Sequence, residues 1–355
     1  MVWTLIGRTI PETELTIMRL LWITHRDLNR DLTRTSRLGL ANALENQGHE
    51  IHWMSPTTGL DYVVNRSKQL GLGHRSFTRS VRLACSSSID VDAVLVEWTA
   101  VEGSYKGLIL QDIPWFILDR SPPVSRGIVG LIQRRQHTRA WKIAREYARG
   151  AIVKSSHHRH LAEHLPVAVV PAGVDVERFE VDRDDRDIPR CIYIGSLAKE
   201  RELIRVHAMD IDAIFMGSGS DAERLLRAGA DVRPASEMKR IPEVLAAADI
   251  GIMHLPNRME WKGASPLKVA EYAAAGLCVV TSDVGDMPDS DSNPWLRLVP
   301  LGDDTAFIEA VNYFRSLSSE MRRHLGKSAK KWARNERDWS VVSAPLNSLI
   351  ENQIA

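Results

Sequence analysis

The sequence predicts an α/β protein with two Rossmann-like, doubly wound domains that face a cleft. First, its 355 residues exceed one ordinary domain and suit two domains of about 150 to 180 residues. Second, short apolar runs rich in β-branched residues alternate with helical patterns in both halves of the chain. Third, a charged linker from Pro171 to about Ile188 separates the halves. We therefore expect an N-terminal extension, two domains and a final helix, at residues 1–17, 18–171, 172–335 and 336–355.

Composition narrows the class of protein. Hydrophobic residues make up 44% and charged residues 26%, which is typical of a soluble globular chain. No apolar run approaches about 18 residues, so we expect no transmembrane helix. Charges interrupt the first 17 residues too often for a signal peptide, and three distant cysteines fit reduced thiols. We therefore expect a cytoplasmic protein, either free or peripheral on the inner face of the membrane.

The net charge of +1 hides an asymmetry. Residues 1–171 carry 22 Lys+Arg and 15 Asp+Glu, a net charge of +7. Residues 172–355 carry the other 24 of the 46 Lys+Arg and the other 30 of the 45 Asp+Glu, a net charge of −6. The most basic stretch is residues 126–149, where an amphipathic helix would suit an anionic membrane surface. The alternative is a solvated helix face. A nucleic-acid partner is not expected, because no nucleic-acid motif and no overall basic charge are present.

The central stretch of the chain is residues 262–287, which predicts a helix, a tight turn and a buried strand. Ser265 before Pro266 is a typical helix start, and Gly276 a typical stop. Lys268 breaks a local rule, because the first turn of a helix favours anions. With the N–H groups of Leu267 and Lys268 and the Ser265 hydroxyl, its ammonium would form an anion site suited to phosphate.

Glu271 lies on the same predicted helix face, about 4.5 Å further along the axis. Its carboxylate would suit ribose hydroxyls while Lys268 holds phosphate oxygens. The alternative is an ordinary Lys–Glu pair worth about 0.2 to 0.5 kcal/mol. A second contribution comes from Gly195 and Ser196, a tight turn between a strand at Cys191 to Ile194 and a helix from Lys199. The backbone N–H groups of this turn would face a bound diphosphate from the side opposite Lys268.

Polar residues also follow the predicted strands of the first domain. His25 and Arg26 follow Leu20 to Ile23, Glu97 follows Ala93 to Val96, and Asp119 and Arg120 follow Trp115 to Leu118. These positions share one sheet edge, so we expect a binding site there for an anionic group such as a lipid phosphate. If a hydroxyl of the ligand reacts at this edge, a general base must lie within hydrogen-bond reach of it, and the order of preference is Asp119, Glu97, then Asp27. The alternatives are a solvated loop and an Asp119 that pairs with an arginine for structure.

Four histidines, at positions 157, 158, 160 and 164, raise the question of a metal site. No zincin-type carboxylate motif accompanies them. We therefore expect a short surface helix from His157 to His164, and no metal.

The central stretch resembles the donor-binding segment of group 1 nucleotide-sugar glycosyltransferases with the GT-B fold. The residues that carry the resemblance are Ser265-Pro266-Leu267-Lys268, Glu271-Tyr272, Gly276 and Val279-Val280, with VVPAGVDVERF, CIYIGSL and AADIGIMHLP upstream. The resemblance implies transfer of a sugar from a UDP- or GDP-linked donor to a lipid-linked, polysaccharide or other glycan acceptor. The acceptor would bind at the polar sheet edge of the first domain, through His25, Arg26, Glu97 and Arg120. The resemblance also implies no cofactor and no required metal, with Lys268 stabilising the leaving diphosphate, and a final helix that crosses back to the first domain.

Two positions depart from the family pattern. Many retaining members carry a glutamate eight residues before Glu271, where this chain has Gly263. A phosphate-binding arginine expected at position 196 is a serine, and Lys199 or Arg201 would replace it. We favour retention over inversion, in which case the departing phosphate takes the proton and Asp119 orients the acceptor.

Two other functions stay open at this point. A GT-B epimerase or hydrolase would consume the nucleotide sugar without an acceptor. A non-catalytic sugar-nucleotide-binding subunit would bind nucleotide without turnover, and the missing glutamate supports it.

Overall fold

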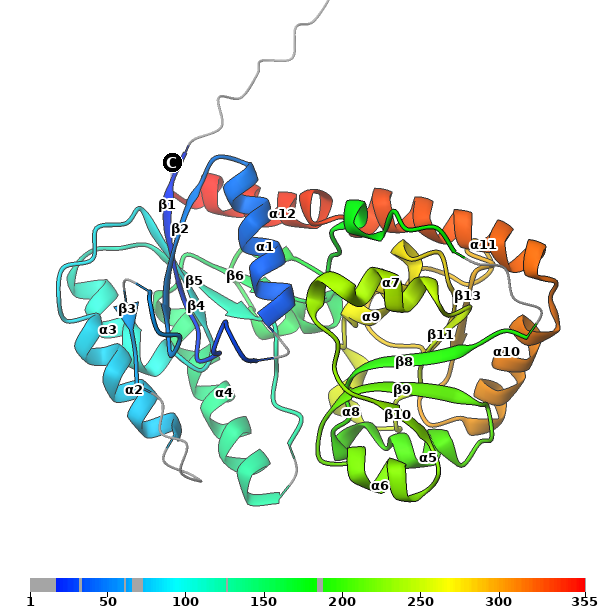
Figure 1. Cartoon of the computed structure of the whole chain (residues 1–355). Helices are drawn as coiled ribbons and strands as arrows, with labels where there is room; N and C mark the ends of the chain where they lie inside the picture. Colours follow the sequence, from blue (N-terminus) through cyan, green and yellow to red (C-terminus); the bar gives the residue numbers. More distant parts are fainter. Residues whose placement is uncertain are drawn as a thin grey trace, which may run out of the picture.

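A computed structural model describes residues 17–31, 34–60, 62–65, 73–125, 127–183 and 188–354. Two parallel sheets, each covered by helices on both faces, form two domains side by side (Figure 1). The prediction of two Rossmann-like domains is therefore confirmed. Within the described part of the chain, every helix is too short or too polar to cross a bilayer.

The first domain is built on a seven-stranded sheet in the order β3-β2-β1-β4-β5-β6-β7, with all neighbours parallel. Its strands β4, β5 and β6 are buried along their whole length, as strands covered on both faces must be. The strands are β1 (Arg19–Ile23), β2 (Glu50–Ser55), β3 (Tyr62–Val63), β4 (Ala93–Glu97), β5 (Trp115–Asp119), β6 (Gly150–Val153) and β7 (Val167–Val169). The helices are α1 (Thr35–Asn46), α2 (Gly73–Ala84), α3 (Val101–Leu110) and α4 (Gly127–Tyr147).

The second domain has a six-stranded parallel sheet in the order β10-β9-β8-β11-β12-β13. The strands are β8 (Cys191–Ser196), β9 (Ala213–Ser218), β10 (Asp231–Arg233), β11 (Ile250–Met253), β12 (Cys278–Ser282) and β13 (Leu296–Val299). The helices are α5 (Leu203–His207), α6 (Ala222–Arg227), α7 (Ile241–Ala246), α8 (Met259–Lys262), α9 (Leu267–Ala274), α10 (Asp304–Ser316) and α11 (Ser319–Trp332). Short 3-10 turns are η2 (Ser156–Leu161), η3 (Val176–Phe179), η4 (Lys199–Arg201) and η5 (Met238–Arg240).

Both sheets change direction of winding at an internal strand pair. In the first sheet the switch lies between β1 and β4, and in the second between β8 and β11. Ligand crevices of open α/β sheets form outside the carboxyl ends of the strands at such a switch point. The topology therefore predicts one crevice in each domain.

The last helix, α12 (Trp339–Ile354), leaves the second domain and packs on the first, as the resemblance implied (Figure 1). A π-helical segment, η6 (Ala333–Arg337), connects it to α11. Gln47 Nε2 donates to Ser343 Oγ at 3.0 Å, and His49 Nε2 lies 2.6 Å from Asn347 Oδ1. The buried side chains of α12 share one core cluster with β1 and α1. The chain thus crosses between the domains twice.

One predicted element differs from the structure. The helix expected from His157 to His164 is the 3-10 turn η2, which ends at Leu161. The predicted N-terminal extension lies outside the described residues except for Ile17.

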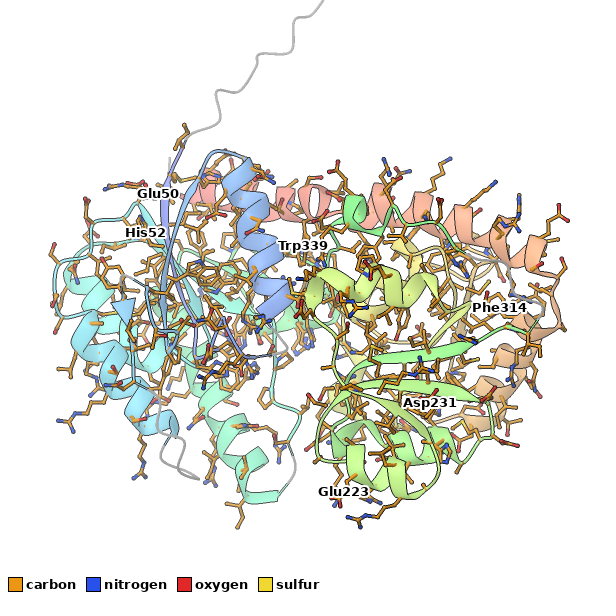
Figure 2. All side chains as sticks on the ribbon, in the orientation of Figure 1. Glu50, His52, Glu223, Asp231, Phe314 and Trp339 are labelled. Carbon is orange, nitrogen blue, oxygen red and sulfur yellow. The ribbon has the colours of Figure 1, made fainter. Side chains whose placement is uncertain are left out.

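The contact between α1 and α12 can be tested at Gly39. A Cβ there would lie 2.2 Å from Nε1 of Trp339, whose rigid ring sits at the start of α12 beside α1 (Figure 2). We expect Gly39→Ala to lower the free energy of unfolding by about 1 to 3 kcal/mol, measured by chemical denaturation. In a Trp339→Ala background the same change should stabilise by up to about 1 kcal/mol, because alanine favours a helix over glycine. Equal effects in both backgrounds would show that the ring does not set the packing.

Candidate functional site

A cleft of about 1560 Å³ lies between the two domains. It is bounded by the carboxyl ends of β1 and β6 on one side and by β8 and the start of α9 on the other. The first domain contributes, among others, His25, Arg26, Asp27, Arg30, Arg34, Arg37, Arg75, Trp98, Thr99, Arg120 and Lys154. The second contributes Gly195, Ser196, Arg201, Trp261, Ser265, Leu267, Lys268 and Glu271, with others. The structure thus brings most of the predicted donor residues to one wall.

Lys268 lies at the N-terminal end of α9 and crosses over the turn at Gly195. It is the second residue of the helix, because the flanking Pro266 is extended with ψ of 114°. A Cβ on Gly195, whose φ is +129°, would lie 2.7 Å from the lysine Nζ. The absence of a side chain at Gly195 therefore lets the ammonium lie on the backbone of the β8 turn. Tyr193 lies beneath it, with 5.4 Å between Nζ and the ring centroid.

The charges of Lys268 and Glu271 are both disfavoured by their surroundings. Burial, helped by the nearby charge of Arg201, lowers the pKa of Lys268, while the Glu271 carboxylate opposes the shift. Burial raises the pKa of Glu271. Among the residues that the structure describes, no ion pair links Lys268 to a carboxylate. An anion entering the cleft would therefore find an ammonium that is not already neutralised by direct contact.

Arg201, rather than Lys199, faces this wall. Lys199 is exposed and does not line the cleft, so the prediction that it binds the donor is corrected. The 3-10 turn η4 carries its first residue outward and its third inward. The Arg201 guanidinium stacks on Trp261, with 4.4 Å between Cζ and the ring centroid, and lines the cleft. Position 201 is thus the better candidate for the cation that position 196 lacks.

Ser265 does not cap α9. No side-chain cap bond is made at this helix start, and the Ser265 hydroxyl instead accepts from the backbone N–H of Ala172 at 2.9 Å. Because Pro266 holds the chain extended, the hydroxyl reaches the segment that joins the domains. The capping prediction is therefore wrong, although Ser265 still lines the cleft.

Asp119 is buried and does not line the cleft, which corrects the prediction of a direct general base. Its Oδ2 accepts from Trp141 Nε1 at 3.0 Å and lies 2.6 Å from His137 Nε2. Both partners belong to α4, which packs over the end of β5. These hydrogen bonds lower the pKa of Asp119 against the opposing effect of burial. Its carboxylate has no open path to an acceptor hydroxyl.

Glu97 is also buried, and it is held by Arg37. The guanidinium donates from Nε at 2.5 Å and from Nη2 at 3.0 Å, and the arginine charge lowers the pKa of Glu97 despite burial. Glu97 does not line the cleft, so the prediction that it contacts the acceptor is corrected. The Oε2 atom of Glu97 lies 3.6 Å from His25 Nδ1, so the carboxylate packs against that ring inside the domain.

His25, Arg26 and Arg120 do line the cleft. His25 Nδ1 lies 2.7 Å from Thr99 Oγ1, and burial lowers the pKa of His25 to about 4, so the imidazole is neutral at pH 7. Arg120 donates to the carbonyls of Val170 and Pro171, at 3.0 and 3.3 Å. His25, Arg26 and Arg120 thus lie together at the cleft, as predicted, while the carboxylates of Glu97 and Asp119 are buried in the domain.

Gly263 marks a close approach of the domains that sequence reasoning missed. A Cβ there would lie 2.2 Å from Cε1 of His158 and 2.8 Å from Cδ2 of His157. Ser155 Oγ also donates to the Gly263 carbonyl at 3.1 Å. A glutamate at position 263 would collide with this contact. Two of the four clustered histidines thus lie at an interdomain contact, and the described residues contain no group of three or more potential metal ligands.

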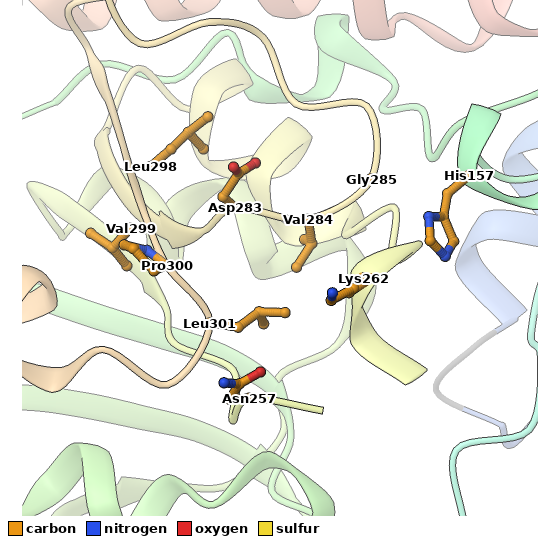
Figure 3. Close-up of a pocket in the computed structure, with 10 residues that line it drawn as sticks. All are labelled: His157, Asn257, Lys262, Asp283, Val284, Gly285, Leu298, Val299, Pro300 and Leu301. Carbon is orange, nitrogen blue, oxygen red and sulfur yellow. The ribbon is translucent and has the colours of Figure 1, made fainter. Parts of the chain in front are cut away.

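A second pocket of about 630 Å³ lies at the carboxyl ends of β12 and β13 (Figure 3). It shares no lining residue with the cleft. Its charged side chains are Lys262 and Asp283, and an apolar wall runs from Leu298 to Leu301. It contains none of the predicted site residues.

Comparison with known proteins agrees with the geometry of the second domain. Residues 191–315 match the sequence model of the family described as "Glycosyl transferases group 1". That range contains β8, Arg201, the start of α9 and Glu271. No curated protein matches the sequence of this chain. The resemblance to group 1 glycosyltransferases is thereby confirmed.

Solved structures share the fold over nearly the whole chain. Sucrose-phosphate synthase from Thermosynechococcus elongatus has a TM-score of 0.70 at 14% identity, covering 94% of this chain and 98% of that one. Anabaena HepE in complex with UDP-glucose has a TM-score of 0.68 at 14% identity, covering 94% and 98%. WaaG, a glycosyltransferase involved in lipopolysaccharide biosynthesis, has a TM-score of 0.69 at 11% identity, covering 93% and 98%. The GT-B architecture is therefore confirmed.

The anion site predicts a specific effect of Lys268→Ala on nucleotide binding. UDP or GDP at about 100 times its Kd should stabilise the wild type by about 2.7 kcal/mol, seen as a rise in melting temperature. We expect most of this rise to be lost in Lys268→Ala, because a charge-assisted contact to the diphosphate disappears. Lys262→Ala, which removes an exposed lysine from the same stretch, should keep it. An equal rise in all three proteins would remove Lys268 from the site.

Proposed function

We propose that this chain, whose second domain matches group 1 glycosyltransferases, moves a sugar from a nucleoside-diphosphate sugar to an anionic glycan acceptor. The observation that carries the proposal is the arrangement of the cleft. One wall carries Lys268 and Glu271 of α9 together with Gly195 and Arg201. The opposite wall carries the positively charged side chains at the strand ends of the first domain. Such a site binds a diphosphate and an acceptor from opposite sides.

The donor half fits a UDP- or GDP-linked sugar. Lys268 and the N–H groups at the start of α9 would hold the diphosphate, and the carboxylate of Glu271 would accept from the ribose hydroxyls. The same groups would stabilise the charge that grows on the diphosphate as the glycosidic bond to it breaks. We therefore propose that transfer needs no metal. The structure of HepE in complex with UDP-glucose supports the choice of nucleotide.

The acceptor half fits an anionic group. Seven lysines and arginines of the first domain line the cleft, against Asp27 and Asp31 as its carboxylates: Arg26, Arg30, Arg34, Arg37, Arg75, Arg120 and Lys154. Even with Glu97 behind Arg37, this wall carries an excess of positive charge. A lipid-linked phosphate is the acceptor chemistry that we favour, and closure of the cleft would exclude water from the transfer.

The helix α4 would bring the protein to the membrane that holds such an acceptor. Its first turns expose the apolar side chains of Ile128 (79%), Val129 (53%), Leu131 (45%) and Ile132 (47%), followed by exposed Arg134, Arg135, Arg139 and Lys142. Arg126, the first residue of the basic stretch, lies outside the described residues. Val129 and Ile132 also line the cleft, so the apolar patch borders its mouth. We propose peripheral binding on the inner face of the membrane.

We propose a retaining course for the transfer. The carboxylates of the last residues of β4 and β5, Glu97 and Asp119, are buried. Arg37 holds Glu97, and His137 with Trp141 holds Asp119. Neither carboxylate is placed to take a proton from the acceptor. An oxygen of the departing diphosphate would take it, while the neutral His25 orients the acceptor hydroxyl.

Transfer can be tested with a lipid-linked acceptor in vesicles. We expect UDP- or GDP-hexose to label a polyprenyl-diphosphate-linked sugar without added metal and with retained anomeric configuration, read by mass spectrometry and NMR. Anionic vesicles should support faster transfer than neutral ones, and Ile128→Glu with Leu131→Glu should remove that difference, because the apolar patch can no longer insert.

The same sugar linked directly to an uncharged lipid alcohol, without the diphosphate, serves as the matched acceptor control and should be a poor substrate. Release of free sugar or of an epimer without acceptor would identify a hydrolase or epimerase instead. Binding of nucleotide without turnover on any acceptor would identify a non-catalytic subunit.

A further inference from the structure

Lys154 is one of the seven cations of the first domain that line the cleft, and the proposed function gives it no individual role. It follows β6 at the carboxyl end of the first sheet and lines the cleft. Within the described part of the chain its ammonium makes no hydrogen bond and no ion pair. Burial, together with the charges of Arg201 and Arg120, lowers the pKa of Lys154 to about 8, while the charge of Asp119 opposes this shift. Such a group is costly to keep charged unless an anion comes to it.

The backbone next to Lys154 is fixed to the donor domain. Its neighbour Ser155 donates to the carbonyl of Gly263, five residues before Lys268. The following residue, Ser156, donates its N–H to Asp286 Oδ2 at 2.7 Å. Lys154 therefore belongs to the first domain by sequence but is held against the wall that carries the predicted diphosphate site.

The electrostatic neighbours of Lys154 span both domains. The charges of Arg120 from the first domain and of Arg201 from the second both lower the pKa of Lys154, and Arg201 also lowers the pKa of Lys268. Lys154, Arg120, Arg201 and Lys268 thus form one continuous group of cations across the cleft. The acceptor-side arginines at positions 26 to 37 follow β1, which β4 and β5 separate from β6 in the sheet. Lys154 therefore lies between Arg120 of the first domain and the donor cations of the second, and away from the arginines that follow β1.

Asp119 supplies the opposite charge behind this group. It is the buried carboxylate that raises the pKa of Lys154, and its Oδ1 has no hydrogen-bond partner among the described residues. The charge of this carboxylate offsets part of the cost of keeping the ammonium charged, and the ammonium still lines the cleft. Asp119 thus acts on Lys154 through its charge, in place of the role of a base.

We propose that Lys154 is a diphosphate ligand supplied by the first domain, so that cations of both domains hold one donor. The proposal rests on the proposed function. It makes donor binding depend on the contact between Ser155 and Gly263, because that contact holds Lys154 in front of the second domain. Lys154 would also share with Lys268 the charge of the leaving diphosphate during transfer.

The experiment measures the Kd of UDP and of uridine by calorimetry for wild type, Lys154→Ala, Lys154→Arg and Lys331→Ala. We expect Lys154→Ala to weaken UDP binding about tenfold to a hundredfold and to leave uridine unchanged, because only the diphosphate is contacted. Lys154→Arg should recover most of the loss, and Lys331→Ala, an exposed lysine on α11, should match the wild type. Melting curves without nucleotide show whether each variant is folded.

Three other results have distinct meanings. If the wild type binds neither UDP nor GDP, the proposed function fails. If it binds UDP and a folded Lys154→Ala binds it equally well, only the role of Lys154 is overturned. If Lys154→Ala raises the KM of the acceptor with the Kd of UDP unchanged, Lys154 belongs to the acceptor half and the proposal is likewise overturned.

Discussion

The structure depends on a cation placed where a helix is already positive. Lys268 stands at the start of α9, lies over the bare backbone of Gly195 and shares its surroundings with Arg201. Burial, the charge of Arg201 and the positive end of the helix each raise the free energy of an ammonium in the empty cleft. Only an anion reverses all of them together, and a diphosphate has the charge and the extent to do so. The tight turn of β8 and the rigid strand–helix unit around α9 hold this arrangement ready before any ligand arrives.

The structure accounts for two departures from the family pattern. At Gly263, His157 and His158 of the first domain occupy the space that a side chain would need, so the glutamate of many retaining relatives would collide with them here. The same contact carries Lys154 to the donor wall. The serine at position 196 is matched by Arg201, which stacks on Trp261 and turns into the cleft. In this chain the first domain thus takes a direct part in shaping the donor site.

Sequence reasoning succeeded where the signal was local or periodic. The two sheets followed from apolar runs and turn glycines, and the returning helix followed from the family resemblance. The Gly195 turn, expected to face the diphosphate from the side opposite Lys268, instead lies directly against the lysine ammonium. Sequence reasoning failed where side chains are decided by long-range contacts. The Ser265 hydroxyl accepts from the amide of Ala172 instead of capping its own helix, and Asp119 contacts two side chains of α4. The residues next to Ser265 and Asp119 in the sequence do not indicate these partners. Lys154 belongs to no recognisable motif. Only its position directly after β6, at the end of a strand, indicated that it could reach the cleft.

The most direct test of the central claim is the proton balance of UDP binding. Burial lowers the pKa of Lys268, and a bound diphosphate would raise it again, so the protein should take up protons when UDP binds above neutral pH. Calorimetric titrations at about pH 8, in buffers with different ionisation enthalpies, measure this number. The account predicts an uptake of a sizeable fraction of a proton that shrinks in Lys268→Ala. Tight binding of UDP with the same heat in every buffer, and unchanged by the substitution, would contradict it.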